Sequence, residues 1–220
     1  MRSTLPTTLA SLLALSLVSG LGAADYHLSA DGDDAAAGTS PTTAWRSLDR
    51  LLSVALQPGD RILLRGGDHF HGRIFLAASG TEGKPITIAS WGEGRASIHA
   101  HPGQDGIMVM DVSHLVIRDL DIRGPGVNEA KKGSGIFLYA AKAKNRGIVI
   151  REVEASDFPA HGIQLWCDDG TVAGFSDVLV ERVACHGSGE GGMGSWDPCK
   201  PGVYSYERVT VRDSVFYGNR

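Results

Sequence analysis

The stretch Gly135-Ile136-Phe137-Leu138 decides how this chain folds, because it recurs along the sequence at a nearly constant interval. Its counterparts are Gly106-Ile107-Met108-Val109, Gly162-Ile163-Gln164-Leu165 and Gly192-Met193-Gly194-Ser195. Successive copies lie 29, 27 and 30 residues apart. In each copy the first and third residues after the opening glycine share one face of an extended chain, and this period of two predicts a β-strand with one buried face.

A second block of sequence recurs in phase with the first, at intervals of 33, 30 and 31 residues. Its copies are Leu115–Leu120, Ile148–Val153, Val178–Val183 and Val209–Ser214. Two independent blocks with the same approximate period indicate a repeat protein. Each copy also contains a charged pair, such as Arg118-Asp119. Because the pair occurs in every copy, we interpret it as an ion pair at a corner of the chain rather than as a catalytic group.

The repeat unit predicts short strands and no helix. A period of 20–50 residues built only from strands fits a parallel β-solenoid or a propeller. A propeller blade needs antiparallel strands and hairpin turns such as Asn-Gly, and that dipeptide does not occur in this sequence. Stacked coils of about three strands fit better, with each strand about 4.8 Å from its counterpart one coil along. We therefore predict an all-β fold, a parallel β-helix.

The N-terminal part of the sequence follows other patterns. Residues 1–24 predict a signal peptide, because Arg2 precedes an apolar stretch too short for a good membrane span, and small residues follow at Gly22-Ala23-Ala24. We expect an exported protein, secreted or periplasmic, with no membrane span after signal removal. The segment Pro41–Gln57 has helical spacing and predicts an amphipathic helix that caps the first coil. Residues 25–220 would then form one domain.

Composition limits the possible partners. The 29 glycines among 220 residues are about twice the usual share, yet they are spread along the chain rather than gathered in a linker. The formal net charge is −4, and no basic tract is interleaved with aromatic residues, so we expect no nucleic-acid partner. We expect a monomer. Cys167 and Cys199 follow successive aromatic positions and could form a disulfide, whereas Cys185 is expected to be a buried free thiol.

Taken together, the sequence resembles secreted right-handed parallel β-helix proteins of the pectate-lyase-like superfamily. The residues that carry this resemblance are Tyr26–Pro41, the predicted helix Pro41–Gln57, Pro58–Gly67, Ser79–Thr81, Lys84–Ile88 and the coils that follow. The resemblance covers nearly the whole chain after residue 24. It implies a right-handed β-helix, but it does not fix the reaction, because the superfamily contains lyases, hydrolases, epimerases and non-catalytic members. Because Arg220 lies just after a repeat strand, we expect the domain to continue beyond it.

Aromatic residues follow the core positions of successive repeats. Met110, Tyr139, Trp166 and Trp196 occupy the same offset, which alternation places on the outer face of the solenoid. Rings held side by side on a rigid sheet suit the apolar faces of sugars. A packing role beneath a loop is the alternative. We predict that Tyr139, Trp166 and Trp196 bind a polysaccharide substrate, because large exposed apolar patches mark binding sites.

Acidic residues come directly after these rings. Asp168, Asp169 and Asp197 belong to adjacent repeats, and gathered carboxylates are suitable ligands for Ca²⁺. Lyases of the superfamily that this sequence resembles use such acidic clusters to hold calcium, which neutralises a uronate carboxylate of an acidic polysaccharide while a base starts β-elimination. Two of these aspartates could instead act as the carboxylate pair of a glycoside hydrolase. Solvated turn aspartates are the remaining interpretation.

The sequence does not single out one residue as the catalytic base of such a lyase. Lys or Arg often has this role in the superfamily, so Lys200 and Lys142 are candidates, as is His161 at the start of its strand. Each of them is also explained by an ordinary surface or corner position. We favour a calcium-assisted lyase, and keep a glycoside hydrolase and a non-catalytic carbohydrate-binding β-helix as alternatives.

Overall fold

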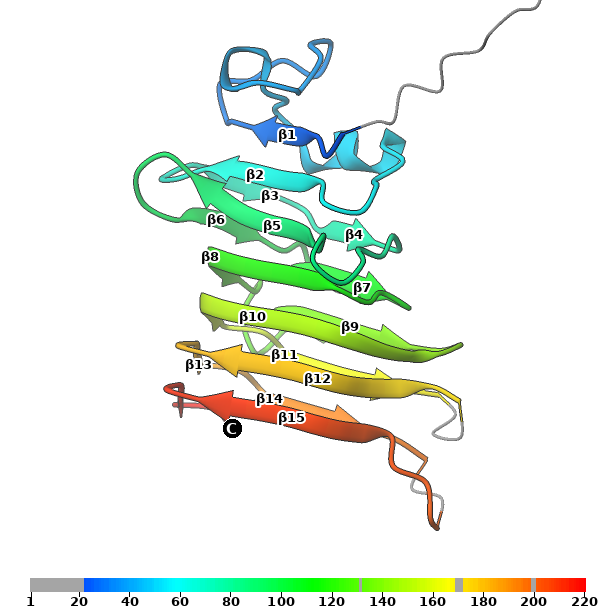
Figure 1. Ribbon diagram of the computed structural model, residues 1–220. Helices are drawn as coiled ribbons and strands as arrows, with labels where there is room; N and C mark the ends of the chain where they lie inside the picture. Colours follow the sequence, from blue (N-terminus) through cyan, green and yellow to red (C-terminus); the bar gives the residue numbers. More distant parts are fainter. Residues whose placement is uncertain (1–21, 131, 169–171, 199–200) are drawn as a thin grey trace, which may run out of the picture.

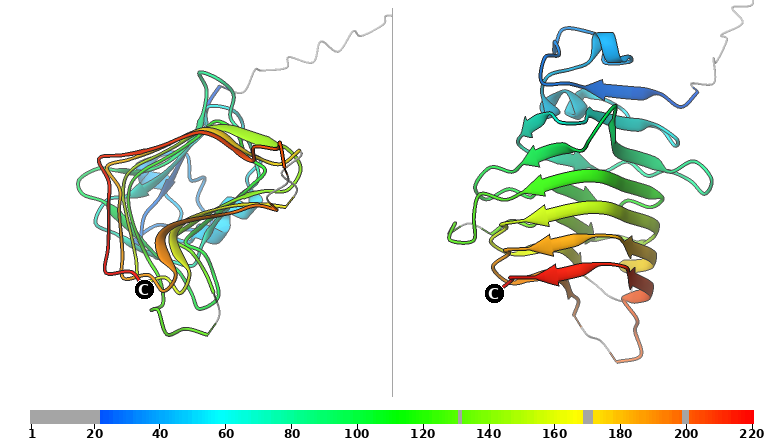
Figure 2. Two further views of the ribbon diagram at one scale, coloured as in Figure 1. Left: turned by 90° about the horizontal axis from the view of Figure 1, so that it is seen from below. Right: turned by 90° about the vertical axis from the view of Figure 1, so that its left-hand side faces the viewer.

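The chain folds into a stack of coils built from parallel strands (Figure 1). The structure, a computed structural model, describes residues 22–130, 132–168, 172–198 and 201–220. Every pair of named strands in these ranges is parallel, and strands pair with their counterparts in neighbouring coils. Viewed along the stack, the coils superimpose on one another (Figure 2). The parallel β-helix predicted from the repeats is confirmed.

Two sheets form the walls of the solenoid. The main path of the larger sheet is, in spatial order, β1 (Asp25–Leu28), β2 (Arg61–Arg65), β5 (Ile86–Trp91), β8 (Leu115–Arg123), β10 (Lys144–Ser156), β12 (Gly174–Glu181) and β15 (Tyr206–Arg212). Beside this path the same sheet contains β3 (His69–His71), β6 (Ala96–His99), β13 (Ala184–His186) and β16 (Val215–Tyr217). The smaller sheet, which holds the candidate site, consists of β4 (Ile74–Leu76), β7 (Ile107–Met110), β9 (Ile136–Ala140), β11 (His161–Cys167) and β14 (Gly191–Trp196).

The larger sheet turns a corner at the charged pairs. Asp119 and Glu152 lie inside β8 and β10 with φ angles of 56° and 54°, in the left-handed region, and the strand direction changes there. In the following coil, Arg182 donates to the Glu152 carboxylate at 3.0 Å. The interpretation of these pairs as corner ion pairs is confirmed.

The core columns follow the predicted register. Ile107, Ile136, Ile163 and Met193 are paired in succession across β7, β9, β11 and β14. The three isoleucines are fully buried, and the residues two positions later, Val109, Leu138 and Leu165, are at most 2% exposed. Burial of these columns supplies the main driving force of the fold, at about 25 cal/mol per Å² of apolar surface.

The predicted cap helix is wrong in its geometry. The segment contains two short 3-10 helices, η1 (Pro41–Thr43) and η2 (Leu48–Ser53), separated by extended backbone. Trp45 lies in that extended part, where its backbone N–H donates to the carbonyl of His27 at 2.9 Å. Pairing with β1 replaces the helical hydrogen bonds there, so tertiary contact overrides local helical preference. Trp45, Leu48 and Leu51 are buried as the apolar face predicted, whereas Leu52 is 68% exposed.

The predicted signal peptide falls mostly outside the described residues, which begin at Gly22. Among the residues that the structure describes, no helix has the length and apolarity needed to cross a membrane.

A histidine cluster at one corner predicts acid sensitivity. His69 Nδ1 lies 3.2 Å from His99 Nε2, which also lies 3.0 Å from Ser97 Oγ, and the His71 ring packs against the His99 ring. Burial, together with the nearby histidines and Arg123, lowers the pKa of His99. A group with a lowered folded-state pKa stabilises the fold above its unfolded pKa, about 6.5, and loses that contribution as the pH falls below it.

We therefore expect the thermal midpoint to fall as the pH is lowered from 7 to 5, and His99→Gln to make this fall shallower. Thermal melts at several pH values measure the effect. His114→Gln, at a turn on the larger sheet, serves as the matched control. An equal pH dependence in the wild type and in His99→Gln would contradict the assignment.

Candidate functional site

The predicted aromatic column is present on the outer face of the smaller sheet. Tyr139, Trp166 and Trp196 are paired in register across β9, β11 and β14, so alternation turns all three outward. The rings of Trp166 and Trp196 are stacked, with centroids 4.3 Å apart and planes at 21°. Trp196 is 44% exposed and Trp166 is half-buried. The predicted geometry is confirmed, and sugar binding by these rings stays a prediction.

A hollow of about 330 Å³ lies beside this column. Phe137 of β9 and Gln164 and Trp166 of β11 line it from the sheet. The remaining lining residues come from the loops before the strands: Asp105, Lys132, Gly133, Ser134, Ala160 and Glu190. The hollow therefore combines aromatic surface with two carboxyl groups, a combination typical of ligand sites.

Asp105 is the unusual carboxyl group of the hollow. It precedes β7, and its Oδ1 accepts a hydrogen bond of 2.8 Å from the backbone N–H of Ser134. Burial raises its pKa, against the opposing effects of that hydrogen bond and of the Arg73 guanidinium. A carboxyl group with a raised pKa keeps its proton at higher pH and can serve as a general acid.

His161 continues the column formed by Asp105 and Ser134, because these three residues occupy the same offset in successive coils. Its backbone N–H contacts Ser134 Oγ at 3.4 Å, and Ser134 Oγ in turn donates to Gln164 Oε1 at 2.8 Å. Burial lowers the pKa of His161, so its imidazole is neutral near pH 7. The ring packs over Gly194, where an added Cβ would come within 2.3 Å of His161 Nε2. Glycine at this position makes room for the ring.

Glu190 is the second carboxyl group that lines the hollow. Its carboxylate lies 3.8 Å from His161 Nδ1 and forms an ion pair of 2.8 Å with Lys132 Nζ. Sequence reasoning missed both Asp105 and Glu190, because neither follows an aromatic position. The signal that could have found Asp105 is the column formed by Asp105, Ser134 and His161, each two residues before a buried isoleucine.

Asp168 and Asp197, two of the aspartates predicted to bind calcium, lie at the other end of the strands. The Tyr139 hydroxyl donates to the Asp168 carboxylate, which raises the pKa of Tyr139. Asp168 and Asp197 both act on the buried Cys167 thiol, so the structure brings these two carboxylates to the same region, as expected. Asp169 lies outside the described residues. No group of three or more His, Cys, Asp or Glu suited to a metal ion occurs in the described part of the chain, and the calcium site stays a prediction.

The other predicted residues do not join the hollow. Lys142 is exposed in the turn after β9, where its backbone N–H donates to Asp111 Oδ1 at 3.0 Å. Lys200 lies outside the described residues, as does Cys199. Cys167 is buried, and because its predicted partner Cys199 is not described, the disulfide between them stays a prediction, whereas Cys185 is a buried free thiol as expected.

Comparisons with known proteins agree with this architecture. No protein-family model matches the chain. A lacto-N-biosidase from Bifidobacterium longum subsp. longum is 30% identical over 131 residues, which are 46% of this chain and 8% of that protein. The crystal structure of a GH136 lacto-N-biosidase from Eubacterium ramulus matches with a TM-score of 0.72 and 19% identity, covering 86% of this chain and 40% of that one. A rhamnogalacturonan lyase matches at 13% identity with a TM-score of 0.49, covering 87% of this chain and 67% of that one.

The chain thus spans less than half the length of either lacto-N-biosidase. The likeness to the Eubacterium ramulus structure, at this identity, concerns the fold. Together with the parallel strand pairing and the buried columns, it identifies the chain as a protein with a parallel β-helix fold.

Proposed function

We propose that this chain is part of a glycoside hydrolase that acts on an oligosaccharide or polysaccharide held on the outer face of the smaller sheet. The observation that carries the proposal is Asp105, a half-buried carboxyl group with a raised pKa, in a hollow that also contains Trp166. Glycosidases need a protonated carboxylic acid next to the scissile oxygen, and a ring surface that holds the sugar in place.

Asp105 would donate its proton to the oxygen of the leaving sugar. Glu190, which pairs with Lys132, is the second carboxyl group and would accept a proton from the attacking water. The two residues belong to coils three steps apart, so their backbones lie about 14 Å apart along the stack. An inverting glycosidase needs about 6.5–9.5 Å between its two carboxyl groups, to leave room for the water, so both side chains would have to reach toward a sugar between them.

His161 would act as a positioning residue. Its lowered pKa keeps the imidazole neutral, and its Nδ1 lies 3.8 Å from the Glu190 carboxylate. A neutral ring can donate a hydrogen bond to a sugar hydroxyl, or accept one from it, without adding charge beside Glu190.

The similarity to two lacto-N-biosidases supports a hydrolase, and a hydrolase does not require a metal. The signal peptide predicted over residues 1–24 supports export, which would place the protein where it meets extracellular glycans. The calcium-assisted lyase expected from the sequence resemblance is the second candidate, and it would use Asp168 and Asp197 instead of Asp105.

The experiment that separates these candidates is a product assay. The protein is incubated with a chromogenic lacto-N-bioside and with a panel of neutral and acidic polysaccharides, with and without a chelator. We expect new reducing ends, no unsaturated-uronide absorbance and no effect of the chelator. Unsaturated products that disappear with the chelator would select the lyase. Glycan binding without any turnover would indicate that the protein is a non-catalytic carbohydrate-binding module.

The stacked tryptophans predict a loss of affinity. Because Trp166 and Trp196 offer one continuous ring surface, Trp196→Ala is expected to weaken glycan binding about tenfold, the effect typical of an anchoring residue. Titration calorimetry with the best ligand of the panel measures it. Tyr217→Ala, at an exposed aromatic residue of β16 on the other sheet, is the matched control. Equal glycan affinities of Trp196→Ala and the wild type would show that the rings are not part of the binding site.

A further inference from the structure

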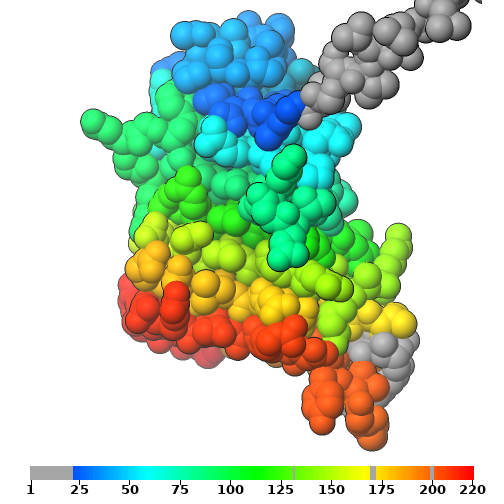
Figure 3. Space-filling view, viewed as in Figure 1, coloured from blue at the N-terminus to red at the C-terminus, as the bar shows by residue number. Residues whose placement is uncertain are grey.

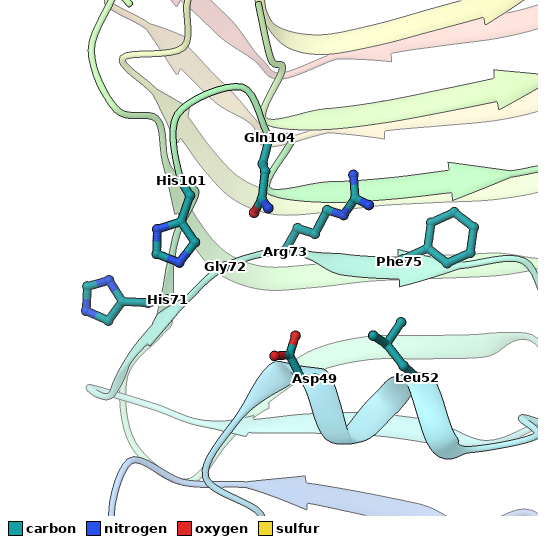
Figure 4. A pocket seen from close by; sticks show the side chains of 8 residues that line it. All are labelled: Asp49, Leu52, His71, Gly72, Arg73, Phe75, His101 and Gln104. Carbon is teal, nitrogen blue, oxygen red and sulfur yellow. The ribbon is translucent and has the colours of Figure 1, made fainter. Parts of the chain in front are cut away.

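A second hollow lies on the same face, nearer the N-terminus (Figure 4). It has a volume of about 380 Å³ and lies between η2 and β4. Asp49 and Leu52 rise into it from η2, and Gln104 points into it from the opposite side. Its other lining residues are His71, Gly72, Arg73, Phe75 and His101.

The hollow contains polar groups with unused hydrogen-bonding capacity. Gln104 Oε1 is buried and accepts no hydrogen bond, which leaves an unsatisfied acceptor at the wall of the hollow. Such an acceptor costs about 1–3 kcal/mol unless a donor reaches it. Arg73 is exposed, and it forms no ion pair within the described ranges. Together with the exposed carboxylate of Asp49, the wall offers two acceptors and one strong donor.

The hollow also has an apolar side. Leu52, 68% exposed, and Phe75, half-buried on β4, line both this hollow and an adjoining apolar depression of about 350 Å³. A ligand that matches all of these groups must carry several hydroxyls on its rim and an apolar C–H face. A neutral sugar residue has this chemistry, because each hydroxyl both donates and accepts.

The two hollows lie along one outward column of side chains. Phe75 belongs to the same outward column as Met108, Phe137 and Gln164, on successive strands of the smaller sheet. Phe75 and Gln164 are three coils apart, about 14 Å. Arg73 of the second hollow acts electrostatically on Asp105 of the first, so these residues join the two.

From these observations we infer that the hollow between η2 and β4 is a second saccharide subsite, which binds a neutral sugar residue of a glycan lying along the stack. The inference rests on the proposed function for the glycan at the first hollow. It gives the N-terminal segment η2 a binding role in addition to covering the first coil. Asp49 and Gln104 would accept hydroxyl protons, Arg73 would donate to hydroxyl oxygens, and Phe75 with Leu52 would contact the C–H face.

The test compares ligand lengths. The protein carrying Asp105→Asn, which prevents turnover, is titrated calorimetrically with three pairs of neutral saccharides. The pairs are cellobiose and cellotetraose, β-1,4-galactobiose and galactotetraose, and chitobiose and chitotetraose. We expect a tetrasaccharide of one series to bind about tenfold more tightly than its disaccharide. Asp49→Asn and Leu52→Ala should each remove most of this gain, and leave the disaccharide affinity unchanged.

Both variants are at exposed positions of η2, so they should not affect folding, and Asp33→Asn in the same N-terminal region is the matched control. A length-dependent gain that persists in Asp49→Asn and Leu52→Ala overturns the subsite, as does a panel in which no tetrasaccharide binds more tightly than its disaccharide. If Trp196→Ala then weakens the binding of both the disaccharide and the tetrasaccharide, the proposed function still holds and only the second subsite is contradicted. If the gain in affinity depends on Asp49 but the protein hydrolyses no glycan, the second subsite is supported and the proposed hydrolase function is contradicted.

Discussion

Replacing Asp105 by Asn is expected to lower the rate of glycoside hydrolysis by about 10²–10⁴-fold, the usual contribution of a general acid. Asn has nearly the same shape and keeps an oxygen that can accept the hydrogen bond from the Ser134 N–H, so the local structure should persist. What it loses is the transferable proton. The kcat of the wild type and of Asp105→Asn on an unactivated oligosaccharide measures the effect.

The leaving group separates acid catalysis from a structural role. A nitrophenyl glycoside departs without protonation, so the loss in Asp105→Asn should be much smaller on that substrate. Asp213→Asn, at an exposed corner of the last coil, is the matched control and should keep full activity. An equal loss on both substrates would show that Asp105 is not the acid.

The pH profile gives a second readout of Asp105. Because the acid must be protonated, the rate should fall as the pH rises through the pKa of Asp105. Burial raises this pKa, so the fall should come at a higher pH than about 3.9, the value of an unperturbed aspartate. Asp105→Asn should abolish this alkaline limb.

Replacing Gly135 by Ala is expected to destabilise the fold by about 3 kcal/mol. A Cβ at this position would come within 2.4 Å of the Gly162 carbonyl oxygen and 2.9 Å of the Ala155 Cβ. The first of these atoms is backbone of the next coil, which cannot move aside without breaking strand pairing, and overpacking of this kind costs 1–3 kcal/mol or more. Chemical denaturation measures the free energy of unfolding.

Gly67→Ala is the control that isolates the close approach. Gly67 has a φ angle of 80° and nothing within 4 Å of an added Cβ, so only the left-handed backbone opposes the substitution, at about 1 kcal/mol. If Gly135→Ala cost no more than Gly67→Ala, the coils would not be in contact at the repeated glycine.

The repeated glycines and the alternating residues after them were enough to predict the fold. A parallel solenoid pairs each strand with its own counterpart, so the interval between Ile107, Ile136 and Ile163 directly encodes the register. The same alternation placed Tyr139, Trp166 and Trp196 on one outer column. The helix predicted over Pro41–Gln57 was wrong, because Trp45 pairs with β1. That strand lies outside the segment, so the spacing of residues within the segment does not reveal the contact.

The candidate site could be predicted only in part. The sequence located its aromatic wall and His161, but it pointed to Asp168 and Asp197 as the acidic groups, since these follow the rings directly. Asp105 precedes its strand, and its raised pKa comes from burial among residues of other coils. Glu190 reaches the hollow through contacts with Lys132 and His161, which belong to earlier coils.

The sequence by itself determined the coil, its register and the direction of each strand side chain, because these follow from a repeat that each strand carries locally. Only the tertiary structure decided which carboxyl group is buried, which carboxylate His161 meets, and that η2 borders a second hollow. Those properties depend on loops of unequal length between the strands, and the path of such loops is set by what they pack against rather than by the repeat.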